Sequence, residues 1–393
     1  MKRPFVTVKG LVLCAVALTA LCAAGFVRAE DEAPAEMVAR GRLLLGGGDG
    51  DKNYTSFNWS LYSPRLLDGG DGDKNPQEAV KLFREAAEQG DAEGQLELGV
   101  CLQKGIGCEK NPKEALKWYR RAAEQGNASA QNELGFSLMH GLDGEKKNPE
   151  EAVQWFRKAA EQGNANAQSN LGSCLRSGIG CEVNNEEAVS WYRKAADQGL
   201  AAAQFNLGNC FEKGKGCQRN LKEAVTWYRR AAEQGDAEGQ FFLADFLLEG
   251  IGCDKNPEEA VKWYRKAAEQ DRPKAQFMLG CCLVEGIGCD EDPEEGLTWF
   301  RQAAEKDYED AQFLLGYNLL HGIDCDKNPK EAVKWLRRAA KRGHADAQLF
   351  LGVCLIKGVG CQKNPKEALN WIQKAADQGQ EDAQAILRKL EKH

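Results

Sequence analysis

A single glutamine returns along most of this chain at a nearly constant interval. Seven of the eight intervals measure 36 residues and one measures 37. A repeat period of about 20 to 50 residues is typical of solenoids, in which one supersecondary unit stacks on the next. A solenoid presents a long repetitive surface instead of one deep pocket. The period therefore favours a binding protein, and its marker residues are Gln95, Gln131, Gln168, Gln204, Gln240, Gln276, Gln312, Gln348 and Gln384.

The second half of each repeat has the pattern of an amphipathic helix with both ends specified. In residues 256–268, apolar residues follow helical spacing and charged residues fill the other face. Asn256 suits the N-cap, Pro257 the first helical position, and Glu259 completes a capping box. Asp271 ends this copy, whereas most copies end in glycine, a common helix stop: Gly90, Gly126, Gly163, Gly199, Gly235, Gly343 and Gly379.

The first half of each repeat predicts a shorter helix that ends in a Gly-x-Gly turn, as in residues 347–360. A glycine recurs inside this helix, where it costs about 1 kcal/mol relative to alanine. Its recurrence predicts a close approach of two helices. Eight of the nine tryptophans share one position on the apolar face of the second helix, and we interpret them as packing between repeats. The predicted fold is all-α: an α/α superhelical solenoid of stacked helix-turn-helix repeats.

The repeat resembles the Sel1-like repeat family, which is related to tetratricopeptide repeats. The resemblance lies in A-x-A-Q-x-x-L-G-x-x-L-x-x-G-x-G followed by N-P-x-E-A-V-x-W-Y-x-K-A-A-E-Q-G. It implies a right-handed superhelix of helix pairs and a role as an adaptor or scaffold. The expected organisation is a signal peptide at 1–29, an irregular polar segment at 30–74, a solenoid at 75–379 with one leading half repeat and eight full repeats, and a C-terminal capping helix at 380–393.

The first 29 residues have the features of a secretory signal peptide. Lys2, Arg3 and Lys9 precede an apolar stretch from Leu11 to Val27, and small residues end at Ala29. An uncleaved anchor is the alternative, but seventeen residues is short for a membrane span. Cleavage leaves 48 basic and 59 acidic residues, a net charge of −11. This charge disfavours nucleic acid as a partner. We expect a secreted or periplasmic protein, a candidate cell-envelope component without a membrane span.

Ten cysteines form five pairs, each seven residues apart. On a continuous helix the two Cα atoms would lie about 10.5 Å apart, beyond disulfide range, so the chain must turn back at the intervening Gly-x-Gly. One repeat lacks both cysteines and has Ser137 and Gly144 instead, as pairing requires. Structural zinc and free thiols are the alternatives; export favours disulfides. The predicted pairs are Cys101 with Cys108, Cys174 with Cys181, Cys210 with Cys217, Cys282 with Cys289, and Cys354 with Cys361.

Three further cysteines have no partner by this rule. Cys253 faces Phe246 and Cys325 faces Asn318, so we expect both as free thiols. Cys281 lies beside Cys282 and is an alternative partner for Cys289.

Cysteine-paired repeats of this spacing resemble a secreted, cysteine-rich branch of Sel1-like proteins. Some members of that branch are proposed to bind penicillins or to act as β-lactamases, so a β-lactam- or peptidoglycan-binding hydrolase is the alternative function. The chain has no S-x-x-K or H-E-x-x-H motif. His140 and His321 occupy equivalent positions in a column of mixed charge, which is typical of a solvated face. We therefore predict no catalytic residues, no metal and no cofactor.

A partner protein or peptide is expected on the first helix of each pair, which lines the concave face in tetratricopeptide repeats. Two columns follow the marker glutamine by one and five residues. The first is rich in aromatic residues, which favours packing over ligand contact, and the second varies in chemistry, as a specificity column would. The predicted partner-binding residues are Phe205, Asn209, Phe241, Asp245, Phe277, Phe313 and Tyr317.

Overall fold

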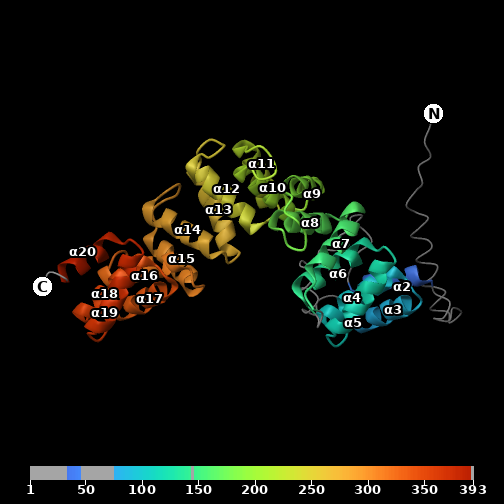
Figure 1. Ribbon diagram of the computed structural model, residues 1–393, viewed down its shortest axis with the longest axis horizontal. Coiled ribbons are helices and arrows are strands. Elements are labelled where there is room, and N and C mark those ends of the chain that lie inside the picture. The colour runs from blue at the N-terminus through green and yellow to red at the C-terminus, as the bar shows by residue number, and fades with distance from the viewer. Residues whose placement is uncertain (1–32, 46–74, 143–145, 391–393) are drawn as a thin grey trace. The chain divides into compact units, whose positions relative to one another are not determined.

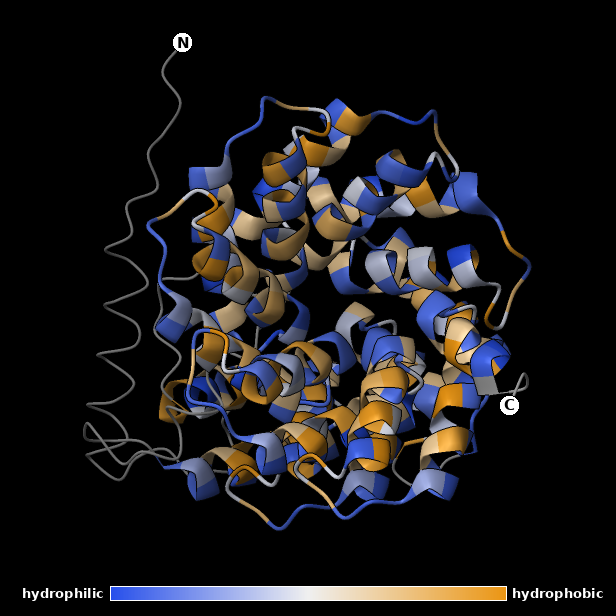
Figure 2. Cartoon of the chain, turned by 90° about the vertical axis from the view of Figure 1, so that its left-hand side faces the viewer, coloured by the Kyte–Doolittle hydropathy of each residue, from blue (hydrophilic) through white to orange (hydrophobic). Residues whose placement is uncertain are grey.

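The computed structural model describes residues 33–45, 75–142 and 146–390, which form nineteen helices and no strands. The predicted signal peptide at 1–29 lies outside these residues. The chain divides into two compact units, residues 1–198 and 199–393. In both units hydrophilic and hydrophobic residues alternate along the helices, as amphipathic packing requires (Figure 2).

We call the even-numbered helices A-helices and the odd-numbered helices B-helices (Figure 1). The first unit contains α2 (Pro34–Leu44), α3 (Pro76–Glu88), α4 (Ala92–Lys104), α5 (Pro112–Glu124), α6 (Ala128–His140), α7 (Pro149–Glu161), α8 (Ala165–Ser177) and α9 (Asn185–Asp197). The second contains α10 (Ala201–Lys213), α11 (Leu221–Glu233), α12 (Ala237–Glu249), α13 (Pro257–Glu269), α14 (Pro273–Glu285), α15 (Pro293–Glu305), α16 (Glu309–His321), α17 (Pro329–Arg342), α18 (Ala345–Lys357), α19 (Pro365–Asp377) and α20 (Glu381–Leu390).

The predicted all-α solenoid is confirmed. Within each unit every A-helix packs on the B-helix that follows it, and that B-helix packs on the next A-helix. The recurrent glycine of the A-helix allows this close approach. A Cβ on Gly208 would lie 2.8 Å from the ring of Tyr228, which is fully buried on the facing B-helix. A larger residue at this position would therefore push the two helices apart.

The N-terminal segment differs from the irregular structure expected for residues 30–74. Residues Pro34–Leu44 form α2, which packs on α3 and buries Met37 and Val38. A Cβ on Gly41 would lie 2.5 Å from the ring of Phe83, the same close approach as in the later repeats. The leading half repeat is thus completed by α2. The sequence pattern missed it because methionine replaces the marker glutamine and residues 46–74 interrupt the period.

The marker glutamine ties the ends of two B-helices together. Nε2 of Gln131 donates to the carbonyl oxygen of Ala123 in the preceding B-helix at 3.1 Å. Its Oε1 accepts from Nε2 of Gln162, which caps its own B-helix, at 2.8 Å. The amide is buried, so a lost partner would leave an unsatisfied polar group. This double role explains why glutamine is the most regular residue of the sequence.

Two consecutive repeats replace this link with ion pairs. Lys306 and Arg342 stand where other B-helices have the capping glutamine, and they pair with Asp271 and Asp307 of the preceding repeats. Both aspartates adopt positive φ, at positions that are otherwise glycine. Each cation that replaces a capping glutamine is matched by an aspartate that replaces a glycine, so an ion pair keeps the contact between repeats.

The B-helices are joined by a second ladder on their outer side. Arg157 donates to Glu187 of the next repeat at 2.6 Å, and the same carboxylate accepts from the indole of Trp191 at 3.1 Å. Lys194 lies over that indole ring at 3.9 Å. In the tryptophan column, Trp191 therefore packs between a carboxylate and a cation and is 8% exposed, whereas the indole N–H of Trp227 is buried without a hydrogen-bond partner among the described residues. Other members such as Trp155 are half-buried.

Candidate interaction surfaces

The aromatic residues predicted to bind a partner pack against aromatic rings within their own repeats. The ring of Phe205 lies 5.7 Å from that of Tyr228, and the ring of Phe241 lies 5.8 Å from that of Tyr264. Phe277 meets Phe300 at 5.6 Å. These are stabilising contacts between an A-helix and its B-helix.

The degree of burial separates these phenylalanines. Phe241 is buried, at 3% exposure, so it is not available to a partner. Phe205, Phe277 and Phe313 are half-buried and keep part of each ring at the surface. The column is therefore only partly a candidate binding surface.

Asn209 and Asp245 have internal partners in the structure. The Tyr264 hydroxyl donates to Asp245 Oδ1 at 2.5 Å. Asn209 hydrogen-bonds the hydroxyl of Tyr228, which also donates to Glu212 at 2.5 Å. Burial raises the pKa of Asp245, and the hydrogen bond from Tyr264 opposes this rise. These two polar residues compensate buried hydroxyl groups of the B-helices.

This pairing explains why the second column varies in chemistry. Where the B-helix has tyrosine, the column supplies a polar residue, as in Ser173 with Tyr192. Where the B-helix has an apolar residue, the column has no hydroxyl to satisfy: Phe136 faces Phe156, Cys281 faces Phe300, Tyr317 faces Leu336 and Val353 faces Ile372. Val100 is the exception, and Gln103 accepts from Tyr119 instead. The variation is accounted for by internal hydrogen bonding, so it does not by itself indicate specificity.

A double-mutant cycle tests this coupling. Tyr264→Phe alone leaves Asp245 without its donor, and Asp245→Val alone leaves the hydroxyl without its acceptor. Each single change should lower the free energy of unfolding by about 1–2 kcal/mol. The double variant, which reproduces the apolar pairs of other repeats, should cost at least about 1 kcal/mol less than the sum. Urea unfolding of the four proteins measures this, and additive effects would contradict the coupling.

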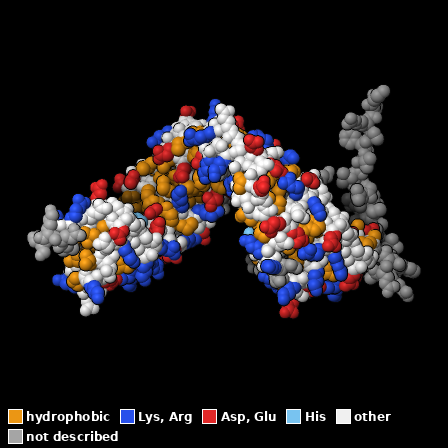
Figure 3. All heavy atoms as spheres, viewed as in Figure 1, with side chains coloured by type: hydrophobic (Ala, Val, Ile, Leu, Met, Phe, Trp, Pro, Cys, Tyr) orange, Lys and Arg blue, Asp and Glu red, His pale blue; other side chains and the backbone are white. Residues whose placement is uncertain are grey.

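The second unit presents a continuous half-exposed apolar surface along its A-helices, which we call the aromatic face. Phe313 meets Phe350 of the next A-helix at 5.9 Å, and Tyr317 meets the same ring at 5.3 Å. Figure 3 shows hydrophobic side chains gathered over the region of α12 and α14. The aromatic face consists of Phe205, Phe242, Phe277, Met278, Phe313, Leu314, Tyr317 and Phe350, all half-buried.

Carboxylates border the aromatic face. Asp245 lies close enough to Glu212 and Glu249 for both to raise its pKa, while Lys274 opposes them. Burial raises the pKa of Cys281 to about 11, and the nearby carboxylates of Glu285 and Asp310 also raise it. The apolar surface is therefore edged mainly by negative charge.

The equivalent A-helix contacts of the first unit are polar. Asn170 donates to Asn132 of the preceding repeat at 2.9 Å. Glu97 is buried and paired with Arg42 of α2 at 2.6 Å. Burial raises the pKa of Glu133, which accepts from Asn132. The two units thus place different chemistry in the contacts between successive A-helices.

The paired cysteines lie where the chain turns back at the end of an A-helix. Gly286 and Gly288 both adopt left-handed conformations, and the turn brings Sγ of Cys289 to 3.7 Å from the carbonyl oxygen of Cys282. Cys361 approaches Cys354 in the same way. The turn expected from the spacing is therefore present. The structure holds these residues as thiols, and the disulfides stay a prediction.

Cys253 and Cys325 occupy the same turns, whereas Cys281 lies inside α14. Sγ of Cys253 lies 3.6 Å from the carbonyl oxygen of Phe246, the residue that replaces its partner. Cys325 and Cys281 are half-buried.

The histidines do not form a metal site within the described chain. The rings of His321 and Tyr317 lie 4.5 Å apart in a tilted arrangement, and those of His140 and Phe136 do the same. Across residues 33–45, 75–142 and 146–390, no three His, Cys, Asp or Glu side chains are arranged to hold a metal ion. In the same residues, no helix is both long enough and apolar enough to cross a membrane.

Stacked helix pairs with half-exposed faces define a repeat protein of the interaction-scaffold class. The chain belongs to the Sel1 repeat family, because the family model matches nine segments that cover most of its length. The matched segments are 65–91, 92–127, 128–164, 165–200, 201–236, 237–271, 273–308, 309–344 and 345–380.

Two solved structures show the same fold with sequence similarity. One is a protective antigen of uropathogenic Escherichia coli strains displaying an SLR fold, with 36% identity, a TM-score of 0.70, and coverage of 79% of this chain and 67% of that one. The other is a Sel1 repeat protein from Oxalobacter formigenes, with 32% identity, a TM-score of 0.59, and coverage of 81% and 94%. A comparison with curated proteins gave no match.

Proposed function

We propose that the protein is an exported, non-catalytic scaffold that binds an apolar segment of another protein on the aromatic face of its second unit. The single observation that carries this proposal is the aromatic face itself. Eight half-buried apolar side chains follow one another along the A-helices α10 to α18. A contiguous apolar surface of this kind marks an interaction site more often than it serves stability.

The chemistry of the aromatic face suits an extended protein segment. Aromatic rings supply large apolar contact areas with little loss of side-chain freedom. Met278 adds a flexible side chain that can adapt to different ligands. The bordering carboxylates Glu249 and Glu285 favour a segment with Lys or Arg beside its apolar residues.

Export and disulfide bonding form part of the same proposal. The basic and apolar pattern of residues 1–29 supports export, and the turn geometry at Cys282 and Cys289 supports pairing. Intact mass of the exported protein should correspond to a chain that begins at Glu30. The hydrolase alternative has no supporting motif in the sequence, and nitrocefin turnover above a matched blank would revive it.

A peptide selection tests the binding function. Random twelve-residue peptides are selected on the mature protein, and the enriched peptides are measured against Met278→Ser/Leu314→Ser/Phe350→Ser. We expect peptides with several apolar residues, and a loss of affinity of about tenfold or more in the variant. Phe136→Ser, which removes an aromatic ring that is 41% exposed in the first unit, is the matched control and should bind normally. Failure to enrich any peptide, or equal binding by the triple variant, would refute the proposal.

A further inference from the structure

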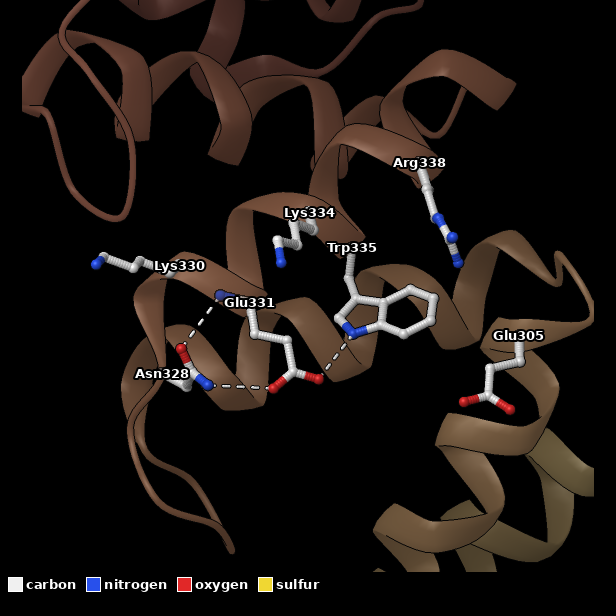
Figure 4. A pocket seen from close by; sticks show the side chains of 7 residues that line it. All are labelled: Glu305, Asn328, Lys330, Glu331, Lys334, Trp335 and Arg338. Atoms are coloured by element: carbon white, nitrogen blue, oxygen red, sulfur yellow. Dashed lines mark hydrogen bonds between the residues drawn. The ribbon is translucent and has the colours of Figure 1, made fainter.

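Helix α17 of the second unit carries a row of positive charge on its exposed side. Lys330, Lys334 and Arg338 follow one another at intervals of four residues, and Lys341 continues the row after three more. All four side chains are exposed. With Glu305 of α15, the first three line an open hollow of about 770 Å³ whose floor includes Trp335 (Figure 4). We call these four residues the basic row.

The basic row forms no ion pair with another residue that the structure describes. The neighbouring carboxylate of Glu331 already pairs with Arg301, and it accepts from Trp335 at 3.3 Å. The Arg338 guanidinium lies over the Trp335 ring at 4.7 Å. The positive charges are thus exposed at the surface, near the carboxylates of Glu305 and Glu331 but without a direct ion pair among the described residues.

Helix stability does not account for this arrangement. Like charges four residues apart destabilise a helix slightly, and Lys330 lies in the first turn, where the helix dipole disfavours a cation. Six cations and one carboxylate give α17 a charge of +5 in a chain whose formal charge is −7. At the position of Lys341 the other B-helices have an acid: Glu88, Glu124, Glu161, Asp197, Glu233, Glu269, Glu305 and Asp377.

We propose that the basic row binds an acidic, extended segment of a partner protein with carboxylates at alternate residues. Four helical residues rise about 6 Å, so the cations are spaced about 6 Å apart along α17. Alternate residues of an extended chain lie about 6.6 Å apart on one side. Three alternating carboxylates therefore match Lys330, Lys334 and Arg338 in register.

The hollow favours a peptide over a continuous polyanion. Glu305 and Glu331 line it together with the cations and would repel closely spaced phosphates. Trp335 adds apolar surface between the charges (Figure 4). The basic row lies on a B-helix, whereas the aromatic face lies on A-helices, so this inference goes beyond the proposed function and does not depend on it. Two separate surfaces would let one scaffold hold two different segments.

Fluorescence anisotropy with labelled peptides tests the inference on the full-length mature protein. The probe is a ten-residue peptide with glutamate at alternate positions and serine between them. A second peptide has the same composition with its glutamates contiguous. We expect the alternating peptide to bind more tightly, and its affinity to fall by about tenfold or more in Lys330→Gln/Lys334→Gln/Arg338→Gln.

The chain offers a matched control for these charges. Lys113, Lys117 and Arg121 have the same spacing on α5, but Glu124 ends that row. Lys113→Gln/Lys117→Gln/Arg121→Gln should leave binding unchanged, and circular dichroism should show both variants folded. Equal binding by the α17 variant, equal binding of the two peptides, or binding only of a single-stranded oligonucleotide or of anionic vesicles would overturn the inference.

Discussion

Reduction of the mature protein is expected to lower its free energy of unfolding more than any single side-chain change. Each predicted disulfide closes a loop of eight residues, and the chain-entropy relation gives about 2.5 kcal/mol for each, less any strain. Two pairs fall in the first unit and three in the second. Their combined loss would exceed the effect of removing one buried ring. Denaturant unfolding of the exported protein with and without a phosphine reductant measures the difference.

Pair and single variants separate the disulfide effect from packing. Cys354→Ser/Cys361→Ser removes one predicted bond, whereas Cys253→Ser removes a thiol that has no cysteine partner. We expect the pair variant to lose up to about 2.5 kcal/mol and the single variant to stay within about 0.5 kcal/mol of the unmodified protein. Mass mapping that finds ten reduced thiols in the exported protein would refute the pairing. Equal stability with and without reductant would show that the bonds add nothing.

In each pair the first cysteine is buried and the second, which we call the outer cysteine, is half-buried. This difference is compatible with disulfide formation that begins with the outer thiol. Burial raises the pKa of Cys282 to about 12 and that of Cys354 to about 11. Burial also raises the pKa of Cys289 and Cys361, their neighbours in the turn, and the nearby Arg265 and Arg337 oppose this rise. Because the thiolate is the reactive form, the less buried cysteine of each of these two pairs, which lies beside an arginine, is the better nucleophile.

Local pattern in the sequence was enough to predict most helices. Asn256, Pro257 and Glu259 mark the start of α13, and the Asn256 side chain indeed accepts from the backbone N–H of Glu259 at 3.1 Å. The recurrent glycine of the A-helices predicted a close approach, which the contact of Gly208 with Tyr228 confirms. These features recur in most copies, so a single copy supplies most of the argument. The exceptions are Asn185 and Leu221 in place of proline, Asp292 in place of asparagine, and Ala244 in place of glycine.

What the pattern could not supply were contacts between residues far apart in the chain. The dependence of Asp245 on Tyr264 joins two helices, and only the structure shows that the variable column follows the hydroxyl groups of the B-helices. Helix α2 was missed because it is separated from the other helices by residues 46–74. The basic row on α17 was visible as sequence, but its hollow and its lack of ion pairs among the described residues were not.

Tyr228→Ala is expected to cost about 3–5 kcal/mol of unfolding free energy, the usual range for removing a buried aromatic ring. The side chain is fully buried, and its ring lies 5.4 Å from both Phe242 and Phe246 and 5.7 Å from Phe205. Alanine would leave a cavity among these rings and would remove the surface on which Gly208 packs. Urea unfolding monitored by circular dichroism gives the overall loss.

Tyr228→Phe is the matched control, because it keeps the ring and removes only the hydroxyl, which donates to Glu212 and hydrogen-bonds Asn209. It should cost about 1 kcal/mol. Since repeats of a solenoid contact mainly their neighbours, the alanine variant should speed amide hydrogen exchange in α10, α11 and α12 more than in α18 and α19. If the phenylalanine variant were as destabilised as the alanine variant, the hydrogen bond and not the ring would hold the pair together. If exchange rose equally in all these helices, the second unit would unfold as one cooperative body and not repeat by repeat.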